Sequence, residues 1–192
     1  MIRDVNALKA ALREQVKAHL AVLSEEQRAA RSAELRARLL EQPIWRKAQS
    51  ILMYAPVSGE ADVWPLLATG LQFGKRVALP RFDPMTRQYV GCQVTNPSQD
   101  LVLGRYGIRE PAVHCESIAL NQLDFVLVPG VAFDLHGRRL GRGKGYYDRM
   151  LAEVRGQTCG VAFDEQIVRE VPISPHDSDV NCILTPTRWI EL

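Results

Sequence analysis

The chain has 192 residues, and 24 Lys and Arg stand against 22 Asp and Glu, for a formal net charge of +2. This near balance argues against binding of nucleic acid through bulk charge. The 46% of hydrophobic residues suits a globular core, and no apolar run is long enough to span a membrane. The start of the chain is a polar, amphipathic segment without an apolar signal sequence, so we expect a cytoplasmic protein, or one in an organelle if the source is eukaryotic.

The cysteines and histidines form no pattern typical of a metal site. The four cysteines are Cys92, Cys115, Cys159 and Cys182. Since no CxxC pair is present, zinc-ribbon and thioredoxin-like sites lack support, and we interpret all four as free thiols in a reducing compartment. His19, His114 and His136 show no ligand-like spacing, and we assign them no role.

Two helices are predicted at the start of the chain. The first is indicated by apolar residues that recur every four positions: Leu8, Leu12, Val16 and Leu20. Ser24-Glu25-Glu26-Gln27 is typical of a capping box, and the second helix should run to about Glu41, before Pro43. For the basic residues from Arg28 to Arg38, a solvated face is favoured over a partner-binding surface.

A cationic stripe runs along the first helix. Lys9, Arg13 and Lys17 follow the same four-residue step beside its apolar face. Taken alone, this spacing favours a solvated surface. The alternative is that Lys9 and Arg13, one turn apart, bind one polyanion together.

Short strands and helices then alternate along the chain. The predicted strands are Ser50–Tyr54, Arg76–Leu79, Tyr89–Val94, Phe125–Val128, Thr158–Ala162 and Cys182–Leu184. The predicted helices among them are Asp62–Phe73, capped by Asp62, and Tyr146–Val154. We expect Pro80 and Pro129 to end their strands. The alternation favours a mostly parallel sheet covered on both faces, with ligands beyond the carboxyl ends of its strands.

The stretch with the most chemical information follows the strand Phe125–Val128. It reads Leu140-Gly141-Arg142-Gly143-Lys144-Gly145-Tyr146-Tyr147-Asp148. Backbone N–H groups in such a loop, beside Arg142 and Lys144, favour binding of an anion, although glycines can also serve tight turns alone. The loop is not a Walker A motif, because Gly145 follows Lys144, and its third glycine comes too early for GxGxxG.

Aromatic and acidic residues near this loop extend the interpretation. Asp148 is a candidate ligand for the metal ion that accompanies a nucleotide phosphate. We expect one of Tyr146 and Tyr147 to lie in the core and the other to stack on a flat ligand. Glu60, just after the first strand, is placed to bind an amino-heterocycle, with an ordinary surface position as the alternative.

A second acidic segment lies near the end of the chain, in His176-Asp177-Ser178-Asp179. Asp177 or Asp179 is a candidate second metal ligand. An Asx turn or a helix cap is the commoner role of Asp in a loop.

The long segments Leu127-Val128-Pro129-Gly130-Val131-Ala132-Phe133-Asp134 and Gly137-Arg138-Arg139, continuing through Asp148, closely resemble the signature of the 5-formyltetrahydrofolate cyclo-ligase family. Lys9-Ala10-Ala11-Leu12-Arg13 resembles its K-x-x-L-R element. Further elements fall in the expected order: Glu60, Leu79-Pro80-Arg81, Tyr106-Gly107-Ile108-Arg109-Glu110-Pro111 and His176-Asp177-Ser178-Asp179-Val180. The resemblance covers nearly the whole chain. It departs at Asn181, where the family often has an acidic residue, so Asp177 is the better metal candidate.

The resemblance implies a single α/β domain over residues 1–192. This domain is a three-layer sandwich with a mostly parallel central sheet, Rossmann-like and of the CoA-transferase type. It also implies a monomer without nucleic-acid or membrane partners. The implied reaction is the ATP- and Mg²⁺-dependent cyclisation of 5-formyltetrahydrofolate to 5,10-methenyltetrahydrofolate, with release of ADP and phosphate. The formyl oxygen is phosphorylated, and N10 of the substrate then attacks the activated carbon.

The resemblance also implies roles for individual residues. Arg142 and Lys144 are the implied catalytic residues, and Asp148 and Asp177 the implied Mg²⁺ ligands. The implied ATP-binding residues are Lys9, Ala10, Ala11, Leu12, Arg13, Arg139, Leu140, Gly141, Arg142, Gly143, Lys144, Gly145, Tyr146 and Tyr147. The implied folate-binding residues are Glu60, Arg142, Gly143, Lys144, Gly145 and Tyr146.

Two other functions remain open at this stage. One is a different ATP-dependent or sugar-phosphate enzyme on a related scaffold, which has phosphate affinity but no folate-dependent ATP hydrolysis. The other is a regulatory module that binds a nucleotide or RNA without catalysis. The presence of Glu60, Lys144 and Asp148 together favours catalysis, because a binding module does not require all three.

Overall fold

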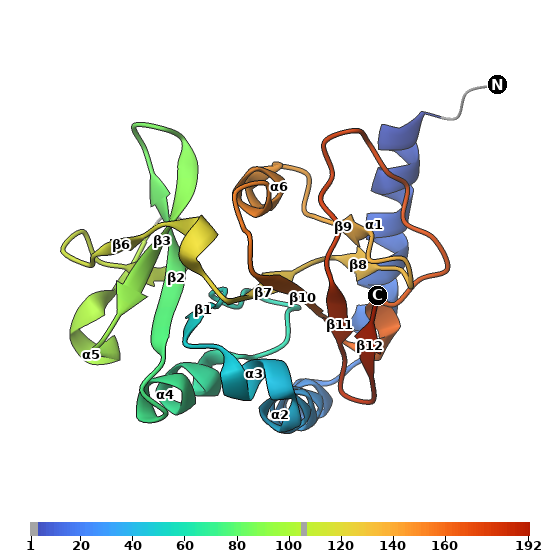
Figure 1. Ribbon diagram of the computed structural model, residues 1–192. Coiled ribbons are helices and arrows are strands. Elements are labelled where there is room, and N and C mark those ends of the chain that lie inside the picture. Colours follow the sequence, from blue (N-terminus) through green and yellow to red (C-terminus); the bar gives the residue numbers. More distant parts are fainter. Residues whose placement is uncertain (1–3, 105–106) are drawn as a thin grey trace.

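The computed structural model describes residues 4–104 and 107–192, and within them eight strands form one sheet in the order β12-β11-β10-β7-β1-β2-β3-β6 (Figure 1). In that order they are β12 (Trp189–Glu191), β11 (Cys182–Leu184), β10 (Gln157–Val161), β7 (Phe125–Pro129), β1 (Ser50–Leu52), β2 (Arg76–Asp83), β3 (Gln88–Val94) and β6 (Ser117–Ile118). The five strands from β11 to β2 are mutually parallel, whereas β12, β3 and β6 pair antiparallel at the two edges. The prediction of a mostly parallel sheet is confirmed.

Helices and two small hairpins surround the sheet. The α-helices are α1 (Val5–Ala21), α2 (Glu25–Glu41), α3 (Pro43–Lys47), α4 (Trp64–Gln72), α5 (Pro97–Asp100) and α6 (Tyr146–Leu151). Two 3₁₀ turns are η2 (Leu120–Gln122) and η3 (Asp164–Gln166). The hairpins pair β4 (Leu101–Leu103) with β5 (Arg109–Pro111), and β8 (Ala132–Phe133) with β9 (Arg139–Leu140).

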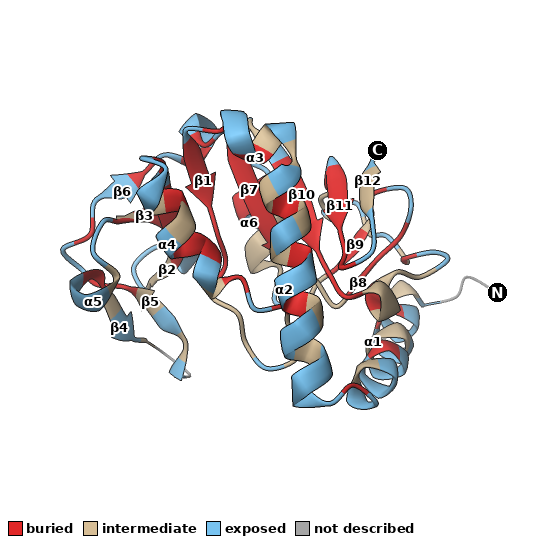
Figure 2. Ribbon diagram, turned by 90° about the horizontal axis from the view of Figure 1, so that it is seen from below, coloured by how far each residue is buried: buried red, intermediate tan, exposed pale blue. Residues whose placement is uncertain are grey.

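The core has two main clusters, one on each face of the sheet. Successive residues of a strand point to opposite faces. On β7, Phe125 and Leu127 therefore join the cluster under α2, α3 and α4, whereas Val126 and Val128 join the cluster with Met150 of α6. Figure 2 shows the central strands buried behind α2, α3 and α4. Because both faces of the sheet are buried, the sequences of these strands are continuous apolar runs.

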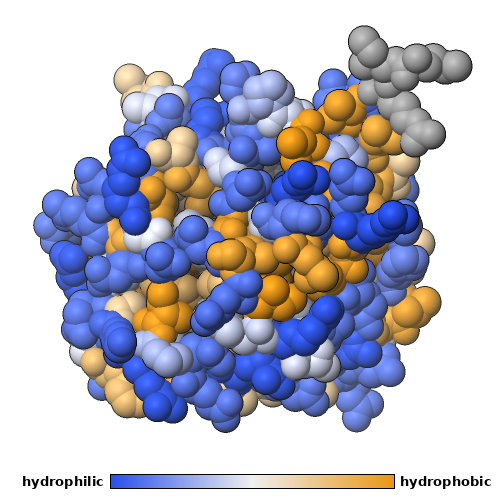
Figure 3. Space-filling view, turned by 45° about the vertical axis from the view of Figure 1, so that its right-hand side comes forward, coloured by the Kyte–Doolittle hydropathy of each residue, from blue (hydrophilic) through white to orange (hydrophobic). Residues whose placement is uncertain are grey.

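The first helix lies beside the main sheet. Val16 of α1 packs against Ala132, Leu140 and Val171, which belong to the β8–β9 hairpin and the segment after η3. Figure 3, with the α1 side of the molecule turned forward, shows hydrophobic patches interrupted by hydrophilic side chains. This packing holds one face of α1 close to the end of β9, where the glycine loop begins.

The predicted helices at the start of the chain are confirmed. The capping box is present, because the Ser24 side chain accepts from the Gln27 N–H and the Gln27 side chain accepts from the Ser24 N–H. The α4 start was predicted one residue early: Val63, not Asp62, is the N-cap, although Asp62 Oδ1 still accepts from the Trp64 N–H at 3.0 Å. No described helix combines the length and apolar character that a membrane crossing requires.

Pro80 does not end its strand as predicted, whereas β7 does end at Pro129. β2 continues through Pro80 to Asp83, because the parallel neighbour β1 ends opposite Ala78 and no partner on that side needs the missing N–H of Pro80. β7 includes Pro129 as its last residue, paired with Val161 on one side. The predicted strand to Tyr54 ends at Leu52 instead.

The helix predicted to reach Val154 ends at Leu151. The N–H groups of Glu153 and Val154 bond to the carbonyls of Met150 and Leu151, three residues back. Such bonds tighten the chain and end the α-helix. The sequence reasoning also missed α3, β12 and both small hairpins.

Candidate active site

A cavity of about 460 Å³ opens where the parallel strands end. Ala55 follows β1, Pro80 belongs to β2, and Pro129 ends β7, and all three line the cavity. The carboxyl ends of parallel strands in α/β sheets are the usual place for ligands. The whole glycine loop from Gly141 to Gly145 lies in the wall, at the end of the sheet where a ligand was expected from the sequence.

The glycine loop connects β9 to α6 with an unusual backbone. Gly143 has φ of 96° and Gly145 has φ of 63°, both in the left-handed region that favours glycine. Between them, Arg142 and Lys144 are exposed and line the cavity. The Gly141 carbonyl accepts a hydrogen bond from Arg13 Nε at 2.9 Å, which ties the loop to α1.

Arg139, before the glycine loop, and Asp148, after it, form an ion pair. Arg139 Nη2 donates to Asp148 Oδ1 at 2.6 Å, and the exposed fractions of the two side chains are 3% and 21%. Arg139 Nη1 donates to the Pro129 carbonyl at 3.3 Å, whereas its buried Nε has no hydrogen-bond partner among residues 4–104 and 107–192. A buried, unpartnered N–H beside a cavity is a donor that a bound anion would satisfy.

The cationic stripe of α1 divides into a buried and a solvated part. Lys9 Nζ donates to Asp177 Oδ2 at 2.5 Å and to Ser174 Oγ at 2.9 Å, with only 11% of its side chain exposed. Lys17 is 79% exposed. The prediction of a solvated surface is therefore wrong for Lys9 and confirmed for Lys17.

Ala10, Ala11 and Leu12, between Lys9 and Arg13 in the K-x-x-L-R element, lie in other surroundings. Leu12 packs against the cluster around Val16, and Ala10 and Ala11 are exposed.

Glu60 lies in a tight turn beside the loop. The Glu60 N–H donates to the Val57 carbonyl, and its Oε2 accepts from the Val57 N–H at 3.1 Å. The buried Tyr54 hydroxyl donates to the Ala61 carbonyl at 2.8 Å and fixes the next residue. Burial raises the pKa of Glu60, and the Val57 N–H and Arg142 oppose that rise. The carboxylate is only 12% exposed, so it is not an ordinary surface residue.

Three aromatic rings form another part of the wall. Phe82 and Tyr89, from β2 and β3, contact Tyr146 edge-on, with ring centroids 5.9 and 5.2 Å away. Arg149 Cζ lies 5.1 Å from the Tyr146 ring centroid. Tyr147 packs against both core clusters. Tyr147 also lines the cavity, so the two tyrosines are not divided between cavity and core as predicted, and stacking of either ring on a ligand stays a prediction.

Several wall residues were not predicted from the sequence: Phe82, Tyr89, Ile108 and Glu110. Phe82 and Tyr89 reach the cavity because β2 and β3 extend past the end of β1. The sequence signal for this extension was a strand pattern that continues through Pro80. Tyr106 belongs to a segment that resembles the family, and it lies outside the described residues.

The two acidic candidates near the C-terminus are separated by their contacts. Asp177 is paired with Lys9 and accepts from the Ser174 N–H at 2.6 Å, whereas Asp179 is exposed. Ser178 Oγ donates to the Asp148 backbone carbonyl at 3.3 Å, so this segment lies against α6. Asn181 Oδ1 accepts from the N–H and hydroxyl of Thr158 and serves the fold.

Cations, carboxylates and aromatic rings thus surround one cavity of an α/β fold. A sequence model of the 5-formyltetrahydrofolate cyclo-ligase family matches residues 5–186, and the chain belongs to this family.

Individual relatives agree with this result. The 5-formyltetrahydrofolate cyclo-ligase of Escherichia coli K12 is 31% identical over 170 residues, which cover 86% of this chain and 93% of that protein. The mouse protein of the same name is 29% identical, with 94% of each chain covered. The solved structure of Aquifex aeolicus 5,10-methenyltetrahydrofolate synthetase is 37% identical, with a TM-score of 0.88 over 96% of this chain and 93% of that one.

Proposed function

We propose that this chain converts 5-formyltetrahydrofolate to 5,10-methenyltetrahydrofolate with consumption of ATP and with Mg²⁺ as the metal. The observation that carries the proposal is the contact between Arg142 and Glu60, 3.0 Å apart in one cavity. Arg142 belongs to the ATP-binding loop and Glu60 is the folate-binding carboxylate. Because they touch, a phosphoryl donor and its acceptor can meet in this cavity.

The chemistry needs no covalent nucleophile from the protein. The formyl oxygen attacks the γ-phosphorus of ATP, and the bond to ADP breaks. N10 of the substrate then attacks the formyl carbon and closes the five-membered ring. The C–O bond breaks as phosphate leaves with its electron pair, and the proton of N10 passes to this phosphate. Such phosphoryl transfer depends on positioning and on neutralisation of charge, which we assign to Arg142 and Lys144.

Cations at three places fit the phosphates of ATP. Arg139 offers its Nε, which has no partner in the described part of the chain, and the loop offers Arg142 and Lys144. Arg13 joins the loop from α1 through the Gly141 carbonyl. Lys9, one turn before Arg13 on α1, is paired with Asp177. In this proposal the glycines keep the backbone close to the phosphates, and Ala10, Ala11 and Leu12 carry the helix that presents Lys9 and Arg13.

The chemistry of two carboxylates fits Mg²⁺. Mg²⁺ prefers oxygen ligands and commonly takes one or two carboxylates together with waters and phosphate oxygens. Asp148 lines the cavity, and the segment that carries Asp177 is hydrogen-bonded to the Asp148 backbone. We propose Asp148 and Asp177 as the residues that hold the ion. When bound, the ion would neutralise phosphate charge, while Arg139 and Lys9 keep the two carboxylates in place.

The folate end of the cavity is assigned to Glu60 and the aromatic wall. A carboxylate held by its own turn can accept hydrogen bonds from an amino-substituted heterocycle. Tyr146 lines the same cavity, and Phe82 and Tyr89 contact its ring edge-on. Aromatic rings of this kind favour a flat ligand.

The test is a spectrophotometric assay with 5-formyltetrahydrofolate, ATP and Mg²⁺ that follows the near-ultraviolet absorbance of the methenyl product. We expect an absorbance rise that depends on both ATP and Mg²⁺. Lys144→Ala should lower kcat by about 100-fold or more, the loss typical of one charge-stabilising group. Lys17→Ala, an exposed lysine on α1, is the matched control and should keep full activity.

Absence of product from folded protein, beside an active control enzyme, would reject the proposal. Phosphate binding without folate-dependent ATP hydrolysis would then favour another phosphate-binding enzyme. A Lys144→Ala protein with normal turnover per folded molecule would reject the role of that residue alone.

A further inference from the structure

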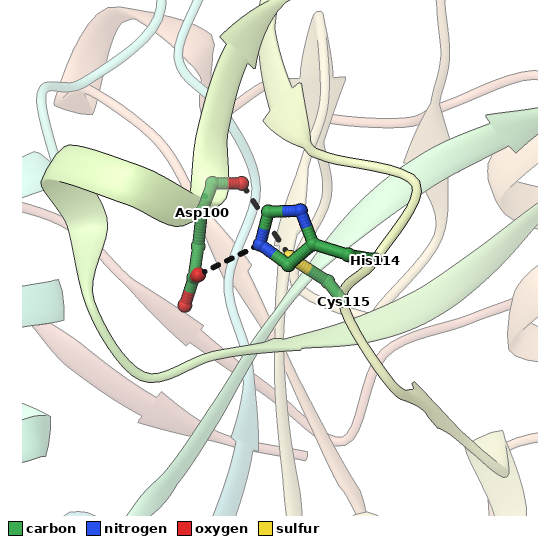
Figure 4. A group of neighbouring side chains, drawn as sticks. All are labelled: Asp100, His114 and Cys115. Carbon is green, nitrogen blue, oxygen red and sulfur yellow. Dashed lines mark hydrogen bonds and ion pairs between the residues drawn. The ribbon is translucent and has the colours of Figure 1, made fainter.

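A second group of reactive side chains lies outside the active cavity. Within residues 4–104 and 107–192, one group of three potential metal ligands is present: Asp100, His114 and Cys115 (Figure 4). Asp100 ends α5, and the other two follow β5 in a turn. Their ligand atoms all lie within 4.8 Å of one another. Nothing in the spacing of these residues indicated this group, which the β4–β5 hairpin brings together.

The Asp100 carboxylate is firmly oriented. Its Oδ2 accepts hydrogen bonds from the Thr95 N–H, the Thr95 hydroxyl and the Asn96 N–H, at 2.7, 3.0 and 2.8 Å. Its other oxygen, Oδ1, lies 3.1 Å from His114 Nε2. One oxygen therefore anchors the side chain while the second is presented to the imidazole. Such supporting hydrogen bonds are typical of carboxylates that bind metals.

The turn with the other two residues is also anchored. The Ala112 N–H donates to the Asp100 carbonyl at 2.7 Å, and the Cys115 N–H donates to the Ala112 carbonyl at 3.0 Å. Arg81 Nη1 donates to the Ala112 carbonyl at 2.8 Å. Cys115 Sγ lies 3.5 Å from the Asp100 carbonyl oxygen. The thiol is therefore held beside the carboxylate by contacts of the backbone.

We propose that Asp100, His114 and Cys115 bind a thiophilic divalent cation of the Zn²⁺ class. A thiolate, an imidazole and a carboxylate are the three ligand types that Zn²⁺ uses in proteins. Two ligands about 2.0–2.1 Å from a tetrahedral ion lie a little over 3 Å apart, close to the distance between Oδ1 and Nε2. The Cys115 thiol loses its proton on binding, and water takes the fourth position.

Access and charge fit such an ion. Cys115 is buried and the Asp100 side chain is 10% exposed, whereas the His114 side chain is 61% exposed and can admit the ion from solvent. The site does not suit Mg²⁺, which prefers oxygen ligands alone. The positive charge of Arg81 opposes the cation, so we expect weaker affinity than in closed structural zinc sites with four protein ligands.

The position of the site gives the ion a structural effect. Asp100 directly precedes β4, and Ala112 directly follows β5, so the three ligands span the base of the β4–β5 hairpin. Ile108 and Glu110, from the same hairpin, line the active cavity. An ion at the base would hold that part of the cavity wall in place.

The test uses Co²⁺ as a spectroscopic probe of the full chain, without folate or ATP. We expect one equivalent of Co²⁺ to give the near-ultraviolet charge-transfer absorbance of a cobalt–thiolate bond. Zn²⁺ should remove this absorbance and Mg²⁺ should not. His114→Ala should weaken Co²⁺ binding about 10-fold or more, a loss typical of disturbing a metal site. Zn²⁺ should raise the melting temperature of the parent protein and not that of His114→Ala.

Matched variants separate this site from other thiols and histidines. Cys115→Ser should abolish the charge-transfer absorbance, and Cys182→Ser, at a buried thiol on β11, should retain it. His19→Ala, an exposed histidine on α1, should bind like the parent chain. Absence of the absorbance in the parent chain, or its survival in Cys115→Ser, would overturn the proposal. Unchanged Co²⁺ affinity in His114→Ala, which leaves the buried residues intact, would overturn it equally.

Discussion

Arg142 donates hydrogen bonds from Nε and Nη2 to Glu60 Oε1, at 3.2 and 3.0 Å, and so joins two parts of the cavity wall that are 82 residues apart in the chain. Arg142 is 59% exposed, whereas Glu60 is 12% exposed. The exposed partner can therefore leave or turn toward a ligand at little cost, while the carboxylate stays fixed by its turn. In the proposed reaction, this pair connects the phosphate and folate ends of the cavity.

Replacing Arg142 should affect turnover far more than stability. Arg142→Ala removes a charge at the phosphoryl group, and we expect kcat to fall by about 100-fold. Because the ion pair is largely exposed on the arginine side, the free energy of unfolding should change by no more than about 1 kcal/mol. Steady-state kinetics and thermal unfolding measure the two effects.

Arg155→Ala, an exposed arginine after α6, is the control and should alter neither quantity. A destabilised Arg142→Ala protein with normal turnover per folded molecule would show that the residue serves the fold.

Glu60→Gln should change how stability depends on pH. Burial raises the pKa of Glu60 above its ordinary value of 4.5, so the folded protein holds this proton more tightly than the unfolded chain. The resulting stabilisation is present below the unfolded pKa and is lost as the pH rises through the folded pKa. Glutamine stays neutral throughout. The melting temperature of Glu60→Gln relative to the parent should therefore increase between about pH 4 and about pH 7.

Thermal unfolding of both proteins across that range measures this difference. A difference that is constant with pH, or that falls as the pH rises, would contradict the raised pKa. In the activity assay, the same variant should raise KM for the folate substrate more than KM for ATP, because Glu60 is assigned to the folate.

Local sequence patterns predicted those features of the structure that depend only on residues close together in the chain. The parallel core strands, the capping box at Ser24 and the glycine loop all follow from residues close together in the chain. The loop from Gly141 to Gly145 was predicted as part of a site because its composition alone favours anion binding, and the cavity contains all of it. The family resemblance supplied roles for these residues that composition could not.

Contacts between distant segments were not predictable in the same way. Arg139 and Asp148 were assigned separately to ATP and to the metal, yet they bind each other across the loop. Lys9 meets Asp177 only because α1 packs on the β8–β9 hairpin, which places residues 168 positions apart in contact. Such pairs depend on how the elements pack, and a single sequence carries no local signal for that.

Lys9→Met should weaken ATP binding and also destabilise the fold. Lys9 and Asp177 are largely buried together, and removal of one charge leaves the other poorly solvated, which we expect to cost about 2 kcal/mol. Loss of a cation near the phosphates should raise KM for ATP by about 10-fold, equivalent to about 1.4 kcal/mol. Chemical denaturation and ATP titration of the initial rate measure these changes.

Lys17→Met provides the comparison on the same helix. Lys17 is 79% exposed, and its contact with Glu14 is 4.0 Å long, so its loss should change stability by less than about 0.5 kcal/mol. Equal effects of the two substitutions would mean that the general charge of α1, and not the position of Lys9, matters.

Asp148→Asn should change the requirement for Mg²⁺. The amide keeps an oxygen that can accept from Arg139 Nη2, so the side-chain contact can persist while the negative charge is lost. Mg²⁺ binds charged carboxylates in preference to amides, and we expect the Mg²⁺ concentration for half-maximal activity to rise at least about 10-fold. Saturating Mg²⁺ should then restore part of kcat. An unchanged Mg²⁺ dependence together with reduced kcat would instead show that Asp148 acts by orienting Arg139, and the metal would then have to be held by other groups.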